Sequence, residues 1–272
     1  MGTIGDGAQM STSTSAPAGI GRVPLALAGR SLIRIYRVPA TFIPSIVMPI
    51  FLVTTFSGLF GALTRLPGFP VDDMIDWMLP MAIVQGSAFA GTTSALGIAF
   101  DIENGFFDRL LLSPAPRRAL LAGPILAGAL RSLVPFLLVL PAGVVVGGAR
   151  LHDPFWGVLS LLAAAVGTSL LGAAWGLGVA LRFPRGAAAP VMQLGIFAAV
   201  FLSTAQVPLA VMSGWLRAVA RVNPMTQVFA LARQGFVGDV TWPGTWPPLL
   251  ALAGFFAFLL LFAARGLRRF RG

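Results

Sequence analysis

The sequence predicts an all-α membrane protein that crosses the bilayer with six transmembrane helices. Of its 272 residues, 57% are hydrophobic and only 10% are charged, whereas ordinary soluble domains are about one quarter charged. Apolar runs of about 20 residues recur along the chain, and this length crosses the ~30 Å hydrocarbon core of a bilayer. Because lipid offers no partners for backbone N–H and C=O groups, we expect these runs to be helices.

The N-terminal region differs from the rest of the chain. Residues 1–21 are rich in Ser, Thr, Gly and Ala, so we expect a disordered tail there. Residues 22–37 follow a helical apolar period and place Arg30, Arg34 and Arg37 on another face. We expect an amphipathic helix that lies at the membrane surface. The alternative is a soluble extension of the first span.

Residues 22–272 are predicted to form one transmembrane domain. Small residues spaced by four, such as Gly86, Ala90 and Ser94, predict close helix contacts, either within the chain or between two copies of it. The third span is longer than one crossing, so its start is expected to continue out of the membrane. The predicted spans are 41–62, 78–100, 119–148, 156–181, 187–208 and 246–264.

The topology follows from the basic residues, all nineteen of which are arginine. With six spans, thirteen arginines fall in segments on the side of the N-terminus and five on the other side. Because positively charged loops stay in the cytoplasm, both termini are expected there. We therefore expect a multi-pass membrane protein with both termini in the cytoplasm. The arginines are spread over loops and ends, which argues against nucleic-acid binding.

Several kinds of chemistry are disfavoured by composition. The chain has no cysteine and one histidine, His152, so we expect no metal site. An intramembrane enzyme would need a catalytic cluster, and His152 has Asp153 beside it but no serine close in sequence. The phosphate-binding pattern GxxxxGK[ST] is absent, so we expect no ATP site of that type and no cofactor in this chain.

The loop between the second and third spans, residues 101–118, has an apolar side. Phe106, Phe107, Leu110 and Leu111 are expected to share one side of a short helix that the prolines at 114 and 116 end. An exposed apolar face needs something to pack on. The two alternatives for the surface that this face packs on are a protein partner and the membrane.

A second unusual segment covers residues 207–233. It lies on the outer side of the predicted topology, yet it is apolar and interrupted by Pro208 and Gly214. Such a segment suggests short helices that dip back into the outer leaflet. Asn223 before Pro224 fits a helix N-cap with proline at the first helical position. The alternative is an interfacial loop with Trp215 as a belt residue.

Polar side chains inside the predicted spans are few, and none of them is ionisable except Arg131 near a cytoplasmic end. A proton-coupled transporter would carry an intramembrane relay of ionisable groups. The pattern therefore favours hydrophobic cargo. The candidates for a transport pathway are Gln85, Gln193, Thr204 and Gln206.

Taken in order, these segments resemble the type-2 ATP-binding-cassette (ABC) exporter permeases, and within them the daunorubicin-resistance permeases. The resemblance runs from about residue 22 to the end. It is carried by Arg37, Pro39 and Pro49 near the first span, by the pattern Asp101, Gly105, Asp108-Arg109, Pro114 and Arg117 in the inner loop, followed by Gly123 and Arg131, and by Asn223-Pro224, Thr226 and Arg233. Pro124 departs from the family, which often has a basic residue there.

The resemblance implies that the inner loop is a coupling helix seated on a separate ATPase subunit, which binds ATP and Mg. The contact residues would be Asp101, Glu103, Gly105, Phe106, Asp108, Arg109, Leu110, Leu111, Pro114 and Arg117. Trp215, Asn223, Pro224 and Thr226 would belong to the outer re-entrant motif. Two permease chains, identical or sister chains, would pair.

The implied function is export of a hydrophobic drug, natural product or lipid-like molecule, with no catalysis by this chain itself. Closure of the ATPase pair on ATP would push the coupling helices and open the pathway outward. The alternatives are a permease for a lipid-linked glycan or cell-envelope lipid, an intramembrane enzyme, and a membrane anchor.

Overall fold

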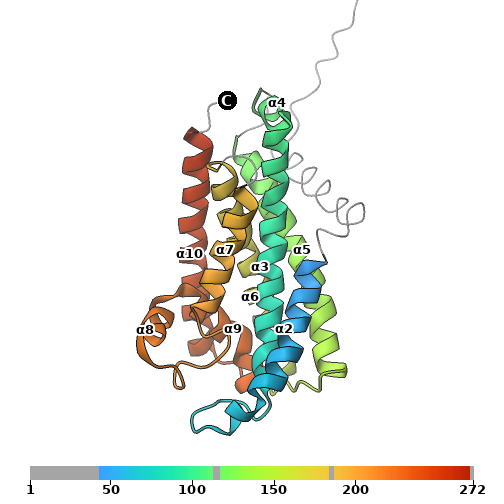
Figure 1. Ribbon diagram of the computed structural model, residues 1–272, viewed down its shortest axis with the longest axis vertical. Coiled ribbons are helices and arrows are strands. Elements are labelled where there is room, and N and C mark those ends of the chain that lie inside the picture. The colour runs from blue at the N-terminus through green and yellow to red at the C-terminus, as the bar shows by residue number, and fades with distance from the viewer. Residues whose placement is uncertain (1–42, 113–116, 184–186, 270–272) are drawn as a thin grey trace, which may run out of the picture.

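The computed structural model describes residues 43–112, 117–183 and 187–269 (Figure 1). All regular secondary structure in these residues is helical. The predicted tail 1–21, the predicted surface helix 22–37 and Pro114 lie outside them. The prediction of an all-α membrane protein is confirmed.

Within the described residues, five helices are long and apolar enough to cross a membrane. They are α2 (Pro44–Phe60) with its 3₁₀ continuation η2 (Gly61–Arg65), α3 (Met74–Glu103), α5 (Arg117–Val145), α6 (Pro154–Ala180) and α10 (Trp242–Arg269). Each overlaps a predicted span. The remaining helices are the shorter α4 (Phe106–Leu112), α7 (Ala188–Phe201), α8 (Gly214–Val222) and α9 (Pro224–Val237).

Helix α7 is shorter than the span predicted for it. It has 14 residues, which is a length of about 21 Å. It ends at Phe201, whereas the predicted span continues to residue 208. The hydroxyl of Ser203 bonds the carbonyl of Val200 just past this end. The chain leaves the helix after Phe201 and turns before α8.

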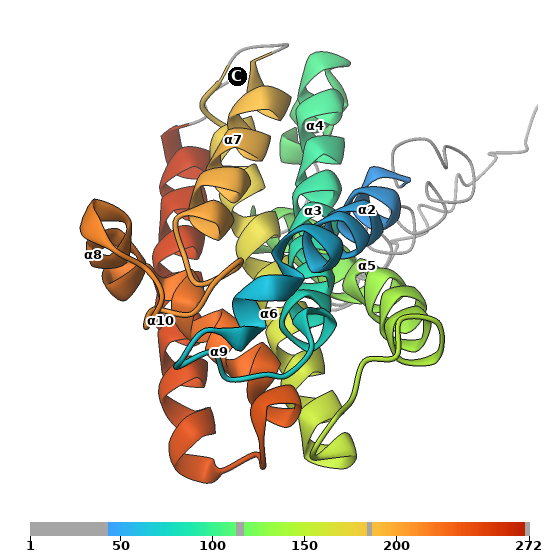
Figure 2. The ribbon, with the colours of Figure 1, turned by 60° about the horizontal axis from the view of Figure 1, so that its bottom comes forward.

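Helix α3 occupies the centre of the bundle. It packs on α6, α5, α2, α9, α7 and α4, and Figure 2 shows it with α2 and α5 to one side and α6 and α7 to the other. In its most apolar 18-residue stretch 78% of the residues are buried, against 17% for α10. The peripheral helices thus present their apolar side chains to lipid.

Small residues allow the closest helix contacts. A Cβ atom at Gly91 would lie 2.0 Å from the carbonyl oxygen of Ser169, so α3 and α6 meet backbone to backbone there. Ser94 follows on α3 and donates to the carbonyl of Pro124 on α5 at 2.8 Å. Of the two uses predicted for small residues, the structure shows packing within the chain at these positions.

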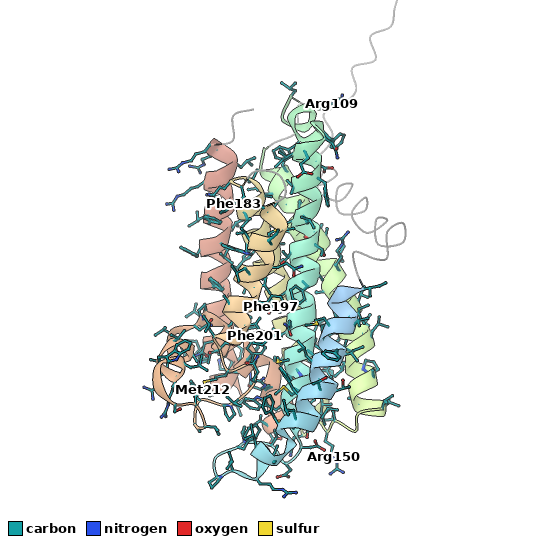
Figure 3. All side chains as sticks on the ribbon, viewed as in Figure 1. Arg109, Arg150, Phe183, Phe197, Phe201 and Met212 are labelled. Carbon is teal, nitrogen blue, oxygen red and sulfur yellow. The ribbon has the colours of Figure 1, made fainter. Side chains whose placement is uncertain are left out.

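The molecule has two ends that differ in construction. Arg109 and Phe183 lie at one end, which we name the α4 end, and the C-terminal end of α10 lies there too (Figures 1 and 3). Arg150 lies at the opposite end (Figure 3), which we name the α9 end and which also holds the loops 66–73 and 146–153, α8 and α9.

Loops at the α9 end are tied to the helices by side chains. Asp73 and Asp153 cap the N-termini of α3 and α6. The carboxylate of Asp76 accepts from the backbone N–H of Arg150 at 2.8 Å. The ring Nδ1 of His152 lies 3.0 Å from the carbonyl oxygen of Phe236 and donates to it. His152 is therefore held by a structural bond to α9.

Candidate functional site

The predicted coupling helix corresponds to α4. Helix α3 ends at Glu103, and Gly105 makes the turn with a φ of +67°, a conformation that glycine adopts without strain. Only two residues separate the helices, so α4 is a direct extension of the central helix. A push on α4 would reach α3 without passing through a flexible loop.

Two of the four residues expected to share one side of α4, Phe106 and Phe107, are described with their side chains, and they differ in burial. Phe107 is 2% exposed and packs in the chain's own core with Leu120, Leu177 and Leu267. Phe106 is 37% exposed and Leu112 is 87% exposed. Neighbouring residues are about 100° apart on a helix, so Phe107 can pack in the core while the adjacent Phe106 stays partly exposed.

The other predicted contact residues surround this helix. Arg109 is exposed, Glu103 is half-buried, and Asp101 is buried with a partner. By backbone position Asp108, Leu110 and Leu111 belong to α4, and Arg117 begins α5; the structure describes nothing of their side chains. Leu112 was missed, although it ends the apolar run directly before the Ser-Pro boundary.

The residues predicted to form a re-entrant motif lie in α8, in α9 and at the junction between them. The predicted N-cap at Asn223 is confirmed, because its Oδ1 accepts from the N–H of Met225 at 2.9 Å and Pro224 opens the helix. Thr226 donates to the carbonyl of Ala220 on α8 at 2.6 Å. Trp215 is 69% exposed on α8.

Asn223 also closes the end of α7. Its Nδ2 donates to the carbonyls of Ala199 and Leu202, both at 2.8 Å. One side chain therefore caps the C-terminus of one helix and the N-terminus of another. This second role needs the fold to bring α7 and α9 together, so it could not be predicted from the Asn-Pro spacing.

Arg233 on α9 is the most buried charged side chain at this end, with an exposed fraction of 3%. Its Nε donates to the carbonyl of Trp77 at 3.0 Å, its Nη1 to that of Thr204 at 2.6 Å, and its Nη2 to that of Ala205. Its Cζ lies 3.7 Å from the centroid of the Trp77 ring. One signal for this role is visible in the sequence, a lone arginine in the apolar run of α9.

The residues predicted to line a transport pathway differ in burial. Gln85 is fully buried on α3, and its amide has no hydrogen-bond partner among the described residues. Gln193 is exposed on α7 and Gln206 is half-buried. Thr204 lines a cavity of about 450 Å³ whose wall also carries Arg233, Gln234 and Asp239.

A second cavity is almost wholly apolar. It has a volume of about 230 Å³ and lies between α6, α7 and α10. Trp175, Phe255 and Phe258 line it, and the one polar residue in the wall, Thr168, bonds the carbonyl of Ala164. This cavity suits a hydrophobic molecule and offers no charge to bind.

At the α4 end, Arg182 joins α6 to α10. Its Nη1 donates to the carbonyl of Gly178 at 2.7 Å and its Nη2 to that of Phe262 at 2.6 Å. Its Cζ stacks 3.7 Å from the centroid of the Phe262 ring. Partial burial lowers the pKa of Arg182, and the nearby charge of Arg269 lowers it further.

Among the described residues no three His, Cys, Asp or Glu side chains are grouped to hold a metal ion.

The fold and the two ends define a helical membrane protein with a short docked helix at one end and a broken, side-chain-capped helix pair at the other. The chain belongs to the ABC-2 type transporter family, whose model matches residues 25–237.

Individual relatives agree with the family. The chain is 25% identical over 244 residues to the daunorubicin resistance ABC transporter permease protein DrrB1 of Streptomyces coeruleorubidus, covering 89% of this chain and 83% of the relative. It is 30% identical over 208 residues to a protein named as the doxorubicin resistance ABC transporter permease protein DrrC of Mycobacterium tuberculosis, covering 76% and 74%. It is 28% identical over 223 residues to a protein named as transport permease ycf38 of Pyropia yezoensis, covering 80% and 74%.

The resemblance drawn from the sequence is thereby confirmed. The chain is a permease subunit of an ABC transporter and is non-catalytic by itself. The family implies an ABC ATPase as partner and a dimeric arrangement in general.

Proposed function

We propose that this permease exports a hydrophobic drug, natural product or lipid-like molecule across the bacterial cytoplasmic membrane, driven by a separate ATPase subunit that docks on α4. The observation that carries the docking site is Leu112, which is 87% exposed at the end of a helix anchored in the core through Phe107. A large apolar side chain held out on a rigid support is a fitting anchor for a partner.

The charge distribution supports the orientation. At the α9 end five aspartates, Asp72, Asp73, Asp76, Asp153 and Asp239, equal the arginines in number, because Arg65, Arg150, Arg217, Arg221 and Arg233 lie there. At the α4 end arginines outnumber acids, and Arg109, Arg182, Arg265, Arg268 and Arg269 are exposed there. By the positive-inside rule the α4 end faces the cytoplasm. Both termini are then cytoplasmic, with α7 and the turn after it as the fifth of six spans.

The ATPase partner would hold ATP and Mg, and this chain would transmit the resulting movement. Only Asn104 and Gly105 separate α4 from α3. Helix α3 in turn contacts five other helices of the bundle besides α4. Displacement of α4 by the ATPase would therefore be passed to the centre of the permease, and two permease chains would part at the outer side.

The cargo is proposed from the apolar interior. The cavity between α6, α7 and α10 has aromatic and aliphatic walls and no charged group, and the relatives named above are called daunorubicin and doxorubicin resistance permeases. Amphipathic aromatic compounds are therefore the first cargo class to test.

The test is transport by the complex in membrane vesicles. Inverted membrane vesicles that contain this chain and its ATPase should take up a fluorescent lipophilic amine on addition of ATP and Mg. Vesicles with the ATPase alone are the control. If no lipophilic compound is moved while deletion of the gene removes a surface glycan or envelope lipid, the drug-export proposal is wrong and the envelope-lipid alternative holds.

A further inference from the structure

Residues 202–213 run without a regular helix between α7 and α8. Because α7 ends at Phe201, the carbonyls around its end lose their intrahelical donors. In a membrane protein such groups are tolerated only where protein or a wet cavity satisfies them. Asn223 serves the carbonyls of Ala199 and Leu202, and Arg233 serves those of Thr204 and Ala205.

Arg233 also reaches a third element. Its Nε bonds the carbonyl of Trp77 on α3, and its guanidinium stacks on the Trp77 ring. One side chain on α9 thus joins the start of α3 to the turn after α7. The planar guanidinium carries donors in fixed, divergent directions, which a lysine ammonium cannot reproduce.

The environment of Arg233 makes this junction hard to open. The side chain is 3% exposed, and its hydrogen-bond partners in the described residues are carbonyls, with no carboxylate among them. Its charge is therefore balanced by peptide dipoles that belong to the two elements it joins. If α9 moved away from residues 204–205, a buried charge and two carbonyls would lose their partners together.

We propose that Arg233 is a positioning residue that holds α9, the start of α3 and residues 202–206 as one rigid block, and that this block moves as a unit when the α9 end opens. The claim that these elements form a rigid block concerns the permease alone. The claim that the block moves as a unit during opening rests on the proposed function. Opening then occurs around the block, between it and its neighbours, and not by separation of α9 from the turn after α7.

The chain offers a reporter for the link between the loop before α3 and the 202–213 segment, which adjoin the elements that Arg233 joins. A Cβ atom built at Gly68 lies 3.7 Å from the Cβ of Ala210, close to the mean separation of about 3.8 Å in disulfides. Gly68 precedes α3, where the adjacent Phe69 packs edge-on to Trp77, and Ala210 lies in the 202–213 segment. The native chain has no cysteine, so a Gly68→Cys/Ala210→Cys variant has no competing thiol.

The first measurement is the rate of disulfide formation in purified permease under mild oxidation, without ATPase or cargo. We expect ready cross-linking in the otherwise native chain and about tenfold slower cross-linking with Arg233→Leu or Arg233→Lys. Gly68 has a φ of +89°, so cysteine is strained there, but equally in every background. The control is Arg182→Leu, which removes a second carbonyl-bonded, ring-stacked arginine and should leave the rate unchanged.

A native rate of disulfide formation with Arg233→Leu would overturn the proposal that Arg233 holds these elements together. If Arg233→Leu does not insert, Arg233→Lys decides: a native rate would show that charge alone suffices and would overturn the bridging role. The second measurement is ATP-driven transport by the complex of the double-cysteine chain before and after oxidation. Unchanged transport supports movement as a unit, whereas transport lost on oxidation and regained on reduction contradicts it. Because cross-linking needs no transport, failure of the block and failure of the proposed function are distinguishable.

Discussion

Two arginines, one at each end of the molecule, make the same kinds of contact but differ in burial and in the number of elements they join. Arg233 and Arg182 each donate to backbone carbonyls and stack at 3.7 Å on an aromatic ring. Arg233 is buried and joins α3, α9 and the turn after α7, whereas Arg182 is exposed and joins only α6 and α10. The number of elements joined and the exclusion of water should decide how much each contributes.

The largest loss of folding stability is expected from Arg233→Leu. The carbonyls of Trp77, Thr204 and Ala205 lose a charged donor that is 3% exposed, and we expect about 3 kcal/mol of destabilisation. Thermal unfolding of the purified permease in one detergent measures it. A loss below about 1 kcal/mol would show that the buried arginine is no more important than an exposed one.

The second largest loss of stability is expected from Asn223→Ala. Asn223→Ala removes two bonds to the end of α7 and the N-cap of α9. Interhelical hydrogen bonds in membranes average about 0.6 kcal/mol and an N-cap is worth about 1 kcal/mol, so we expect about 2 kcal/mol in total. Asn223→Ser is the matched variant, because a serine keeps the cap acceptor and lacks the amide donors. If serine and alanine are equally destabilising, the link to α7 carries the whole effect and the cap none.

Arg182→Leu is expected to have the smallest effect. The side chain is exposed, and solvent replaces the bonds it makes to Gly178 and Phe262, so the loss should stay below about 1 kcal/mol. The same unfolding measurement applies. A loss as large as that of Arg233→Leu would remove the distinction between the two ends.

The long helices could be predicted from the sequence, but their burial could not. Apolar length alone located α3 and α10, since any crossing needs about 20 apolar residues. Yet α10, mostly facing lipid, and α3, mostly buried, are both apolar. In a bilayer the surroundings of a helix are as apolar as its partners, so hydrophobicity does not tell which side chains touch protein.

The site was predicted in its local features and missed in its long-range ones. The cap at Asn223 follows from two adjacent residues, and the short α4 follows from an apolar run between Gly105 and Pro114. The role of Arg233 depends on Trp77, which is 156 positions away, and no spacing rule covers that distance. The split of Phe106 and Phe107 between surface and core likewise depends on where α5 and α6 pass.

The most direct test of the account is whether the ATPase is retained through α4. Leu112→Asp places a charge on the exposed end of α4, where a partner contact is proposed, and alters no membrane span. Val146→Asp is the matched control, because Val146 is 86% exposed but lies at the α9 end. Co-purification of the ATPase from detergent-solubilised membranes, at equal permease abundance, is the measurement. We predict more than tenfold lower recovery of the ATPase with Leu112→Asp and native recovery with Val146→Asp. Native recovery with both variants would contradict the assignment of α4 as the coupling helix.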